Sequence, residues 1–264
     1  MPFTTKNRRG TAAFPSSKTF IMTRLMPSAN AAAMSSCLSA ARLGKNSPTS
    51  LTTRPSLKPP TRRSWTNTNI TWLDFDVEGN NLDKGKQDSE RRNTVLASLQ
   101  KKNPGLIISY TLPVDPNGIS EASQALLADA KAKGVKIHSA NLMVMYFGKE
   151  FINKGKSEGQ LGADSANTAY AQLRKIDPAI QVGLCPCLGR NGSKDEVFTL
   201  DDAKILKAFA DKTPWVCSLH YWSINDDAAR PRKKRTITST NSVTISNSPQ
   251  PWAFAKIFQT FTAP

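Results

Sequence analysis

The sequence predicts an α/β protein that forms a partial (β/α)8 TIM barrel, with about five of the eight strand–helix units, after an irregular N-terminal segment. Three observations favour this class. From residue 69 onward, apolar strand-like runs alternate with amphipathic helical patterns. The strands are nearly continuous in apolar residues, as expected for parallel strands covered on both faces. No Gly-x-Gly-x-x-Gly or phosphate loop follows any strand, which disfavours a nucleotide-binding sheet.

The elements follow one another in a regular order. Ser120 is a predicted helix N-cap and Gly134 the matching helix stop, while Thr199 and Asp202 have the spacing of a capping box. We expect strands at 70–78, 106–114, 136–147, 180–189 and 215–224, and helices near 88–102, 120–134, 164–175, 199–212 and 251–258.

Charge divides the chain into two regions. The formal net charge is +16, but residues 1–68 hold eleven Lys or Arg and no acid, and all twenty acids lie within 69–227. We therefore divide the chain into an irregular basic segment, 1–68, and a partial barrel domain, 69–264. The basic run Arg-Pro-Arg-Lys-Lys-Arg at 230–235 is the best argument for a nucleic-acid binder. No recognition helix or interleaved aromatic residues accompany it, so we expect no nucleic-acid partner.

Metal, membrane and export signals are weak. Cys185 and Cys187 lack a second ligand pair at zinc-site spacing, so we expect buried thiols and no metal. No apolar run approaches the ~18 residues of a membrane span, and no apolar h-region follows the first charges. His138 and His220 have no identifiable carboxylate partner in the sequence, and we interpret both as packed or surface residues.

Three acids mark the first predicted strand. Residues 71–79, Thr-Trp-Leu-Asp-Phe-Asp-Val-Glu-Gly, place Asp74, Asp76 and Glu78 at every second position. Alternate side chains of a strand share a face, and three like charges there repel and lose solvation. A structural strand should avoid this pattern, so it indicates chemistry at the C-terminal strand ends, where barrel enzymes hold their catalytic groups.

The same stretch resembles the catalytic strand of glycoside hydrolase family 18, the chitinases, whose motif is Asp-x-x-Asp-x-Asp-x-Glu. Asp74, Asp76 and Glu78 match it, and Thr71 replaces the first Asp. Further segments resemble the family in the same order, at 108–119, 141–148, 182–210 and 221–226, where the Trp of the last strand falls on Trp222. The resemblance covers roughly 69–227 and the end near 249–258.

The resemblance implies a substrate-assisted, retaining mechanism without cofactor or metal. Glu78 would be the general acid, and the substrate's own acetamido oxygen the nucleophile. Asp76 would hold the acetamido N–H, and Asp74 would share a proton with Asp76 and raise the pKa values of the cluster. Trp222 would form the apolar floor under the sugar. The implied partners are chitin or N-acetylglucosamine oligosaccharides, for a monomeric protein that the family secretes.

The segment 141–148 departs from the family. Met143 and Met145 line the barrel, but the family's Asp-Tyr pair falls on Tyr146 and Phe147, and Phe147 has no hydroxyl for the acetamido carbonyl. Tyr146 could serve in its place, although a slip of one residue turns a side chain to the other face. A non-catalytic, lectin-like chitin-binding relative is therefore the alternative to an enzyme.

Residues 1–68 are interpreted as translated out of frame. In a shifted reading frame, each codon consists of the last base of one present codon and the first two bases of the following codon. This frame reads Met22-Thr23 as Asp and Met26-Pro27 as Ala. This frame also allows a strand that ends in Ser-x-Gly-Gly, which the family barrel requires. As written, we expect no regular βα pattern in 1–68, an unpaired edge on the strand with the acids, and weak or no activity.

Overall fold

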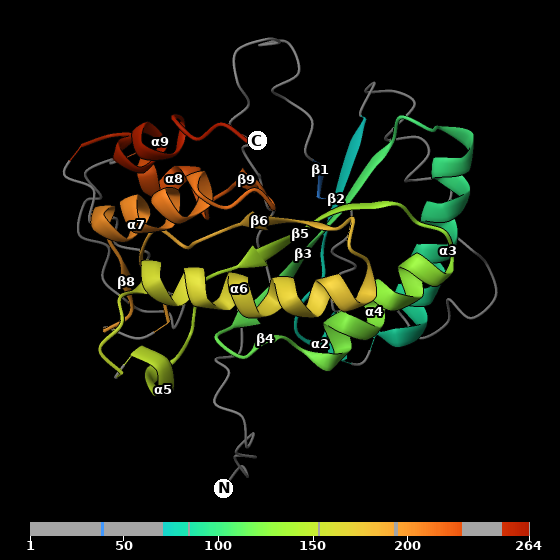
Figure 1. The fold of residues 1–264 in the computed structure, drawn as a ribbon, viewed down its shortest axis with the longest axis horizontal. Helices are drawn as coiled ribbons and strands as arrows, with labels where there is room; N and C mark the ends of the chain where they lie inside the picture. The colour runs from blue at the N-terminus through green and yellow to red at the C-terminus, as the bar shows by residue number, and fades with distance from the viewer. Residues whose placement is uncertain are drawn as a thin grey trace, which may run out of the picture.

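The computed structural model describes residues 38–39, 71–83, 85–152, 154–192, 195–228 and 250–263. The helices and strands alternate along the chain, as the sequence predicts (Figure 1). The elements are β1 Leu38–Ser39, β2 Trp72–Asp76, α2 Asn80–Asp83, α3 Lys86–Lys102, β3 Ile107–Asp115, β4 Gly118–Ile119, α4 Glu121–Ala132, β5 Ile137–Met143, α5 Lys149–Ile152, α6 Glu158–Ile176, β6 Gln181–Leu184, β7 Gly189–Arg190, β8 Val197–Phe198, α7 Leu200–Asp211, β9 Val216–Leu219, α8 Ile224–Asp227 and α9 Ala253–Phe258.

One mixed sheet of seven strands organises the described residues. Its order is β1-β2-β3-β5-β6-β9, all parallel, while β4 pairs antiparallel with the end of β3. Neighbouring helices pack on one another in chain order, α3 on α4, α4 on α6, α6 on α7 and α7 on α9 (Figure 1). In the part of the chain that the structure describes, β1 and β9 are the two ends of this order. The predicted α/β fold, a partial barrel that is not closed, is confirmed.

The edge of β2 differs from the expectation. Leu38 pairs with Leu73, and Ser39 with Asp74, so a short strand from the N-terminal segment covers part of the edge that was expected to be unpaired. That expectation was wrong for these two positions, because any extended chain can satisfy the open N–H and C=O groups of an edge. The remaining residues of 1–68, including Cys37, lie outside the described residues, as does the basic run 230–235.

Most helix signals are confirmed. Ser120 caps α4 by accepting from the Ser123 N–H, and the Thr199–Asp202 capping box opens α7. The helix expected at 164–175 starts earlier, at Glu158, because a capping box of Ser157 with Gln160 begins it there. Strands β2, β5, β6 and β9 end earlier than expected, whereas β3 runs one residue further, to Asp115. Residues 189–198 contain an unpredicted antiparallel pair, β7–β8. No helix within the described ranges is long and apolar enough to cross a membrane.

The two faces of the sheet differ in polarity. The outer face packs under the helices in the main apolar core, with Leu73 and Phe75 of β2 among its residues. The inner face is polar, although barrel interiors are usually filled by branched apolar side chains. Its buried polar residues are Asp74, Ser109, Thr111, Ser139, Asn141, Ser218 and His220.

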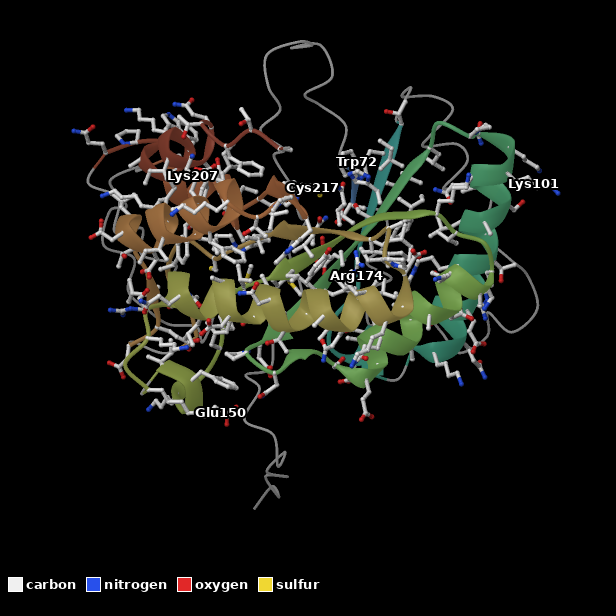
Figure 2. All side chains as sticks on the ribbon, viewed as in Figure 1. Trp72, Lys101, Glu150, Arg174, Lys207 and Cys217 are labelled. Atoms are coloured by element: carbon white, nitrogen blue, oxygen red, sulfur yellow. The ribbon has the colours of Figure 1, made fainter. Side chains whose placement is uncertain are left out.

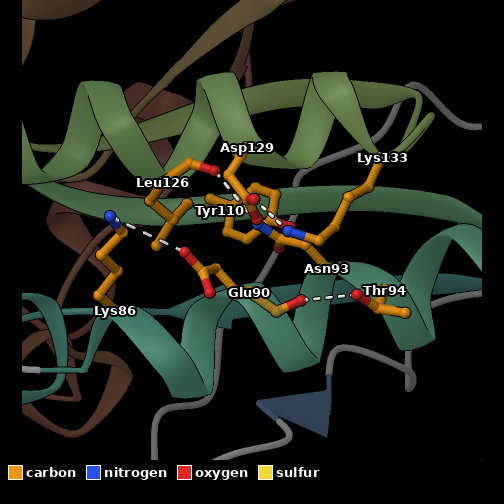
Figure 3. Close-up of polar contacts among 8 residues, drawn as sticks. All are labelled: Lys86, Glu90, Asn93, Thr94, Tyr110, Leu126, Asp129 and Lys133. Carbon is orange, nitrogen blue, oxygen red and sulfur yellow. Dashed lines mark hydrogen bonds and ion pairs between the residues drawn. The ribbon is translucent and has the colours of Figure 1, made fainter.

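A polar joint fixes the outer face to two helices (Figure 3). The Tyr110 hydroxyl of β3 donates to Asn93 Oδ1 of α3 at 2.7 Å. Asn93 Nδ2 in turn donates to the Leu126 carbonyl at 3.2 Å and to Asp129 Oδ2 at 2.8 Å, both on α4. Lys133 pairs with the same Asp129. The joint therefore holds β3, α3 and α4 in one arrangement.

Candidate active site

The strand with the three acids lies beside β3, and its register sets their positions. Asp74 pairs with Ser109 and Asp76 with Thr111, so these four side chains share the inner face. The ladder continues through the bond from the Val77 N–H to the Thr111 carbonyl, 3.0 Å. Asp74 is buried, and Asp76 and the more distal Glu78 are half-buried. Asp76 is thus the last residue of β2, with Asp74 two positions before it and Glu78 two positions beyond the strand.

Asp74 is enclosed by donors from two other strands. Its carboxylate accepts from Ser109 Oγ at 2.5 Å, Thr111 Oγ1 at 2.7 Å and Asn141 Nδ2 at 2.8 Å. Burial raises the pKa of Asp74, and these three hydrogen bonds oppose the increase. The sequence interpretation attributed a raised pKa to neighbouring carboxylates, whereas loss of solvent is the largest cause.

The contacts of Asp74 extend across the inner face. Trp72 Nε1–H donates to Ser109 Oγ at 2.8 Å, which orients the Ser109 hydroxyl toward Asp74. Ser139 Oγ donates to Asn141 Oδ1 at 3.1 Å. Ser109, Thr111 and Asn141 were not predicted site residues. Their signal was a polar side chain at alternate positions of otherwise apolar strands, the same pattern that revealed the acids.

The two histidines are packed, as the sequence interpretation held. His220 is buried on the inner face and forms a 2.8 Å hydrogen bond with Ser218 Oγ. His138 packs edge-on against the Trp72 ring, with centroids 5.0 Å apart. Trp72 and Cys217 lie on the sheet in the upper part of Figure 2, on β2 and β9 respectively.

A second cluster lies next to the acids and contains the other predicted site residues. Met143 and Met145 form it with Cys185 and Cys187, and Tyr146 and Trp222 pack against it. We call these six residues the Met–Cys cluster. Burial raises the pKa of the Cys185 thiol, and Cys187, Asp76 and Asp74 add to the increase, which places the cluster close to the acids. The structure therefore brings the four predicted substrate-binding residues together.

The segment after β5 separates Tyr146 from Phe147. Tyr146 adopts a left-handed backbone conformation, φ 56°, which turns the chain between the two side chains. Phe147 is buried in the main apolar core, whereas Tyr146 packs against the Met–Cys cluster with Trp222. Of the two, Tyr146 lies on the side of the site.

Residues from later in the chain hold this segment. Asn191, beside β7, and Glu196, beside β8, accept from backbone N–H groups of the segment, and Asn191 also contacts Glu158 of α6. Glu158, Asn191 and Glu196 are buried and were not predicted from the sequence. Within the described ranges, no group of three or more His, Cys, Asp or Glu could hold a metal ion.

Known proteins similar to this chain are chitinases. No model of a protein family matches the sequence. A probable bifunctional chitinase/lysozyme of Escherichia coli K12 is 32% identical over 212 residues, 74% of this chain, and endochitinase 11 of Metarhizium anisopliae is 33% identical over 177 residues, 61% of this chain. The chain spans only 23% and 34% of the lengths of these two relatives.

The fold agrees with the sequence comparison. The catalytic domain of a hyperthermophilic chitinase from Pyrococcus furiosus superposes with a TM-score of 0.63 at 26% identity, over 79% of this chain and 66% of that domain. Catalytic-site mutants of active domain 2 of a Pyrococcus furiosus chitinase superpose similarly, including one complexed with chito-oligosaccharides, with a TM-score of 0.62.

Proposed function

We propose that this chain, a member of the chitinase-related glycoside hydrolases, cleaves β-1,4 linkages between N-acetylglucosamine units. Its resemblance to the glycoside hydrolase family 18 chitinases, first read from residues 71–79, agrees with its relatives and its fold. One observation carries the proposal: Asp74 and Asp76 of β2, with Glu78 just after the strand, lie beside the Met–Cys cluster, which combines apolar side chains with a Tyr and a Trp.

The proposed reaction uses the substrate as its own nucleophile. Glu78 donates a proton to the glycosidic oxygen as the bond from C1 to that oxygen breaks. The acetamido carbonyl oxygen attacks C1 and closes a five-membered ring, while Asp76 accepts from the acetamido N–H and balances its positive charge. Water then attacks C1 and gives a proton to Glu78, as the bond from C1 to the acetamido oxygen breaks and the acetamido group is restored. Because C1 is attacked twice from alternate faces, its configuration is retained.

The remaining residues position the substrate in this proposal. Trp222 forms the floor under the sugar, and Met143 and Met145 complete the apolar wall. Tyr146 offers the hydroxyl to the acetamido carbonyl, because Phe147 is buried in the core. Asp74, held by three donors, positions Asp76 from behind. Chitin oligosaccharides are the proposed partners of a secreted monomer.

The test compares the full chain with its Glu78→Gln variant on chitin oligosaccharides. A side chain that acts as general acid contributes ~10²–10⁴-fold to the rate, so Glu78→Gln should lower turnover by that factor and leave oligosaccharide affinity nearly unchanged. Because the described sheet is open, wild-type turnover is expected to be low, and a protein with the N-terminal frame restored serves as the active reference. Equal turnover in wild type and Glu78→Gln would refute the mechanism.

The same assay separates the alternatives. Oligosaccharide binding without products, in both the full chain and the frame-restored protein, would assign a lectin-like function. A nucleic-acid binder would instead bind DNA with an affinity that falls steeply with salt. Exposed Glu150 on α5 provides a matched control, since Glu150→Gln should leave turnover unchanged.

A further inference from the structure

The segment 144–148 carries Tyr146 into the site, yet it is irregular. After β5 ends at Met143, its local backbone bonds run from the Val144 N–H to the Leu142 carbonyl and from the Met145 N–H to the Met143 carbonyl, 3.0 and 2.9 Å. The N–H groups of Tyr146 and Gly148 are satisfied by side chains from the β7–β8 pair. The conformation at Tyr146 therefore depends on residues more than forty positions later.

Two side chains make these bonds. Asn191 Oδ1 accepts from the Tyr146 N–H at 2.9 Å, and Glu196 Oε1 accepts from the Gly148 N–H at 2.9 Å. Asn191 and Glu196 also bond to each other through the backbone, from the Asn191 N–H to the Glu196 carbonyl at 2.9 Å. The two acceptors are thus linked to each other, and they bind Tyr146 and Gly148, the residues on either side of Phe147.

Gly192 lets this unit approach the Tyr146 ring. A Cβ at Gly192 would lie 2.2 Å from Glu196 Oε2 and 3.4 Å from Tyr146 Cδ1. Its φ of +58° is a conformation that only glycine adopts readily. The absence of a side chain at this position allows the Glu196 carboxylate and the Tyr146 ring to pack against the same turn.

Helix α6 supports the unit from below. Asn191 Nδ2 donates to Glu158 Oε2 at 2.9 Å, in the first turn of α6. This bond fixes the orientation of the Asn191 amide: its nitrogen is engaged by Glu158, so its Oδ1 faces the Tyr146 N–H. Glu158 is 4% exposed, and the charged groups that act on it are Glu196 and Asp202, both acids.

We propose that Asn191, Glu196 and Glu158 form a clamp that positions Tyr146 for the sugar, and that the clamp loosens when Glu158 loses its proton. This inference rests on the proposed function for the role of Tyr146, whereas the clamp itself is a property of the fold. Deprotonation would place a charge beside Glu196 and Asp202 in a buried site, and the repulsion would act on the side chain that holds Gly148.

The titration of Glu158 supports this reading of the geometry. Burial is the largest cause that raises the pKa of Glu158, the Asn191 hydrogen bond opposes it, and Glu196 and Asp202 add to the increase. Together they bring the pKa to about 8. Glu158 is therefore protonated at neutral pH and ionises in the mildly alkaline range. The clamp should hold below that range and weaken above it.

The first experiment needs no ligand. Amide hydrogen exchange at Tyr146 and Gly148 is measured in the full chain from pH 6 to 9 and expressed as protection relative to an unstructured peptide. Asn191→Ala should lower protection at Tyr146 by about tenfold, as expected for a lost hydrogen bond of ~1.4 kcal/mol. Wild-type protection at Gly148 should fall above pH 8, and Glu158→Gln, which still accepts from Asn191, should remove that fall.

Two matched controls isolate the clamp. Gly192→Ala should lower protection at Gly148, whereas Gly155→Ala should not, because a Cβ at Gly155 meets nothing within 4 Å although its φ is also positive, +78°. Glu150→Gln, on α5 at the edge of the molecule in Figure 2, should leave every value unchanged. Unchanged protection at Tyr146 in Asn191→Ala, or a pH dependence that survives Glu158→Gln, would overturn the clamp.

The second experiment links the clamp to the sugar. Dissociation constants for a chitin oligosaccharide are measured with Glu78→Gln and with the double variant Glu78→Gln/Asn191→Ala. The second change should weaken binding about tenfold, the factor that a lost ~1.4 kcal/mol contact implies. Equal affinities would refute the positioning role. If neither protein binds, the proposed function fails, and the exchange data still decide whether the clamp exists.

Discussion

A Cβ atom at Gly183 would lie 2.3 Å from Oδ1 of Asn141 on the neighbouring strand. The same atom would be 2.7 Å from Ser218 Oγ and 3.0 Å from His220 Nε2. Gly183 therefore creates the space in which side chains of β5 and β9 meet on the inner face of the sheet. Asn141 in turn holds Asp74.

Gly183→Ala tests this packing. The added methyl group must displace Asn141, so we expect a loss of ~1–3 kcal/mol in the free energy of unfolding, as for an overpacked interior. Gly105→Ala is the control, because a Cβ there meets nothing within 4 Å. Urea denaturation measures both. A Gly183→Ala protein as stable as the control would show that Asn141 relaxes at no cost.

Removing the amide of Asn141 should act on Asp74. Asn141→Ala takes away a hydrogen bond that lowers the pKa of Asp74, so the pKa should rise further. Turnover should fall, and the acidic limb of the pH–rate profile should move to higher pH. Exposed Asn167 on α6 is the control, with Asn167→Ala expected to leave the profile unchanged. If turnover falls but the acidic limb of the pH–rate profile stays at the same pH, Asn141 supports the fold and does not tune Asp74.

Breaking the polar joint of Figure 3, which lies outside the group of acids, should lower the stability of the protein. Tyr110→Phe removes the donor to Asn93 Oδ1 and leaves a buried acceptor without that bond, which costs about 1–3 kcal/mol. Tyr170→Phe is the control, since among the described residues its hydroxyl accepts just one long hydrogen bond, 3.4 Å, from exposed Arg174. Thermal unfolding of both variants measures the difference. Equal midpoints would show that the joint contributes nothing.

Glu158 should make stability fall with rising pH. Its folded pKa, about 8, exceeds the ordinary value of 4.5, so the folded state binds more protons than the unfolded state between these values. The free energy of unfolding should therefore decrease from about pH 4.5 to pH 8, by on the order of 5 kcal/mol. In Glu158→Gln, the free energy of unfolding should depend much less on pH between these values. Parallel decreases in both proteins would assign the effect to other groups.

The nucleotide sequence upstream of the Asn69 codon tests the origin of residues 1–68. In the alternative frame, Ser-x-Gly-Gly falls on the codons of residues 37–41, which include β1. Sequencing the gene and its transcript should reveal a base change or splice site that joins this frame to the frame of residue 69. If a single frame runs through an independently confirmed transcript, the basic segment is genuine and needs a function of its own.

Local signals were sufficient for much of the fold. Ser120 and the Thr199–Asp202 pair start helices because their side chains bond N–H groups within three residues, so the information lies in adjacent positions. The alternation of Asp74 and Asp76 on one face is local in the same sense, because a strand has a period of two. The β7–β8 pair was missed because a two-residue strand leaves no periodic pattern.

The sequence by itself determined that acids line one face of a strand in a parallel α/β sheet. Only the tertiary structure decided what surrounds them. Asp74 meets Asn141 through a register between strands 67 positions apart in the chain, and Tyr146 meets Asn191 across 45 positions. Such contacts depend on strand order, register and helix packing, which burial of the whole core determines together. No single window of the sequence therefore carries a signal for them.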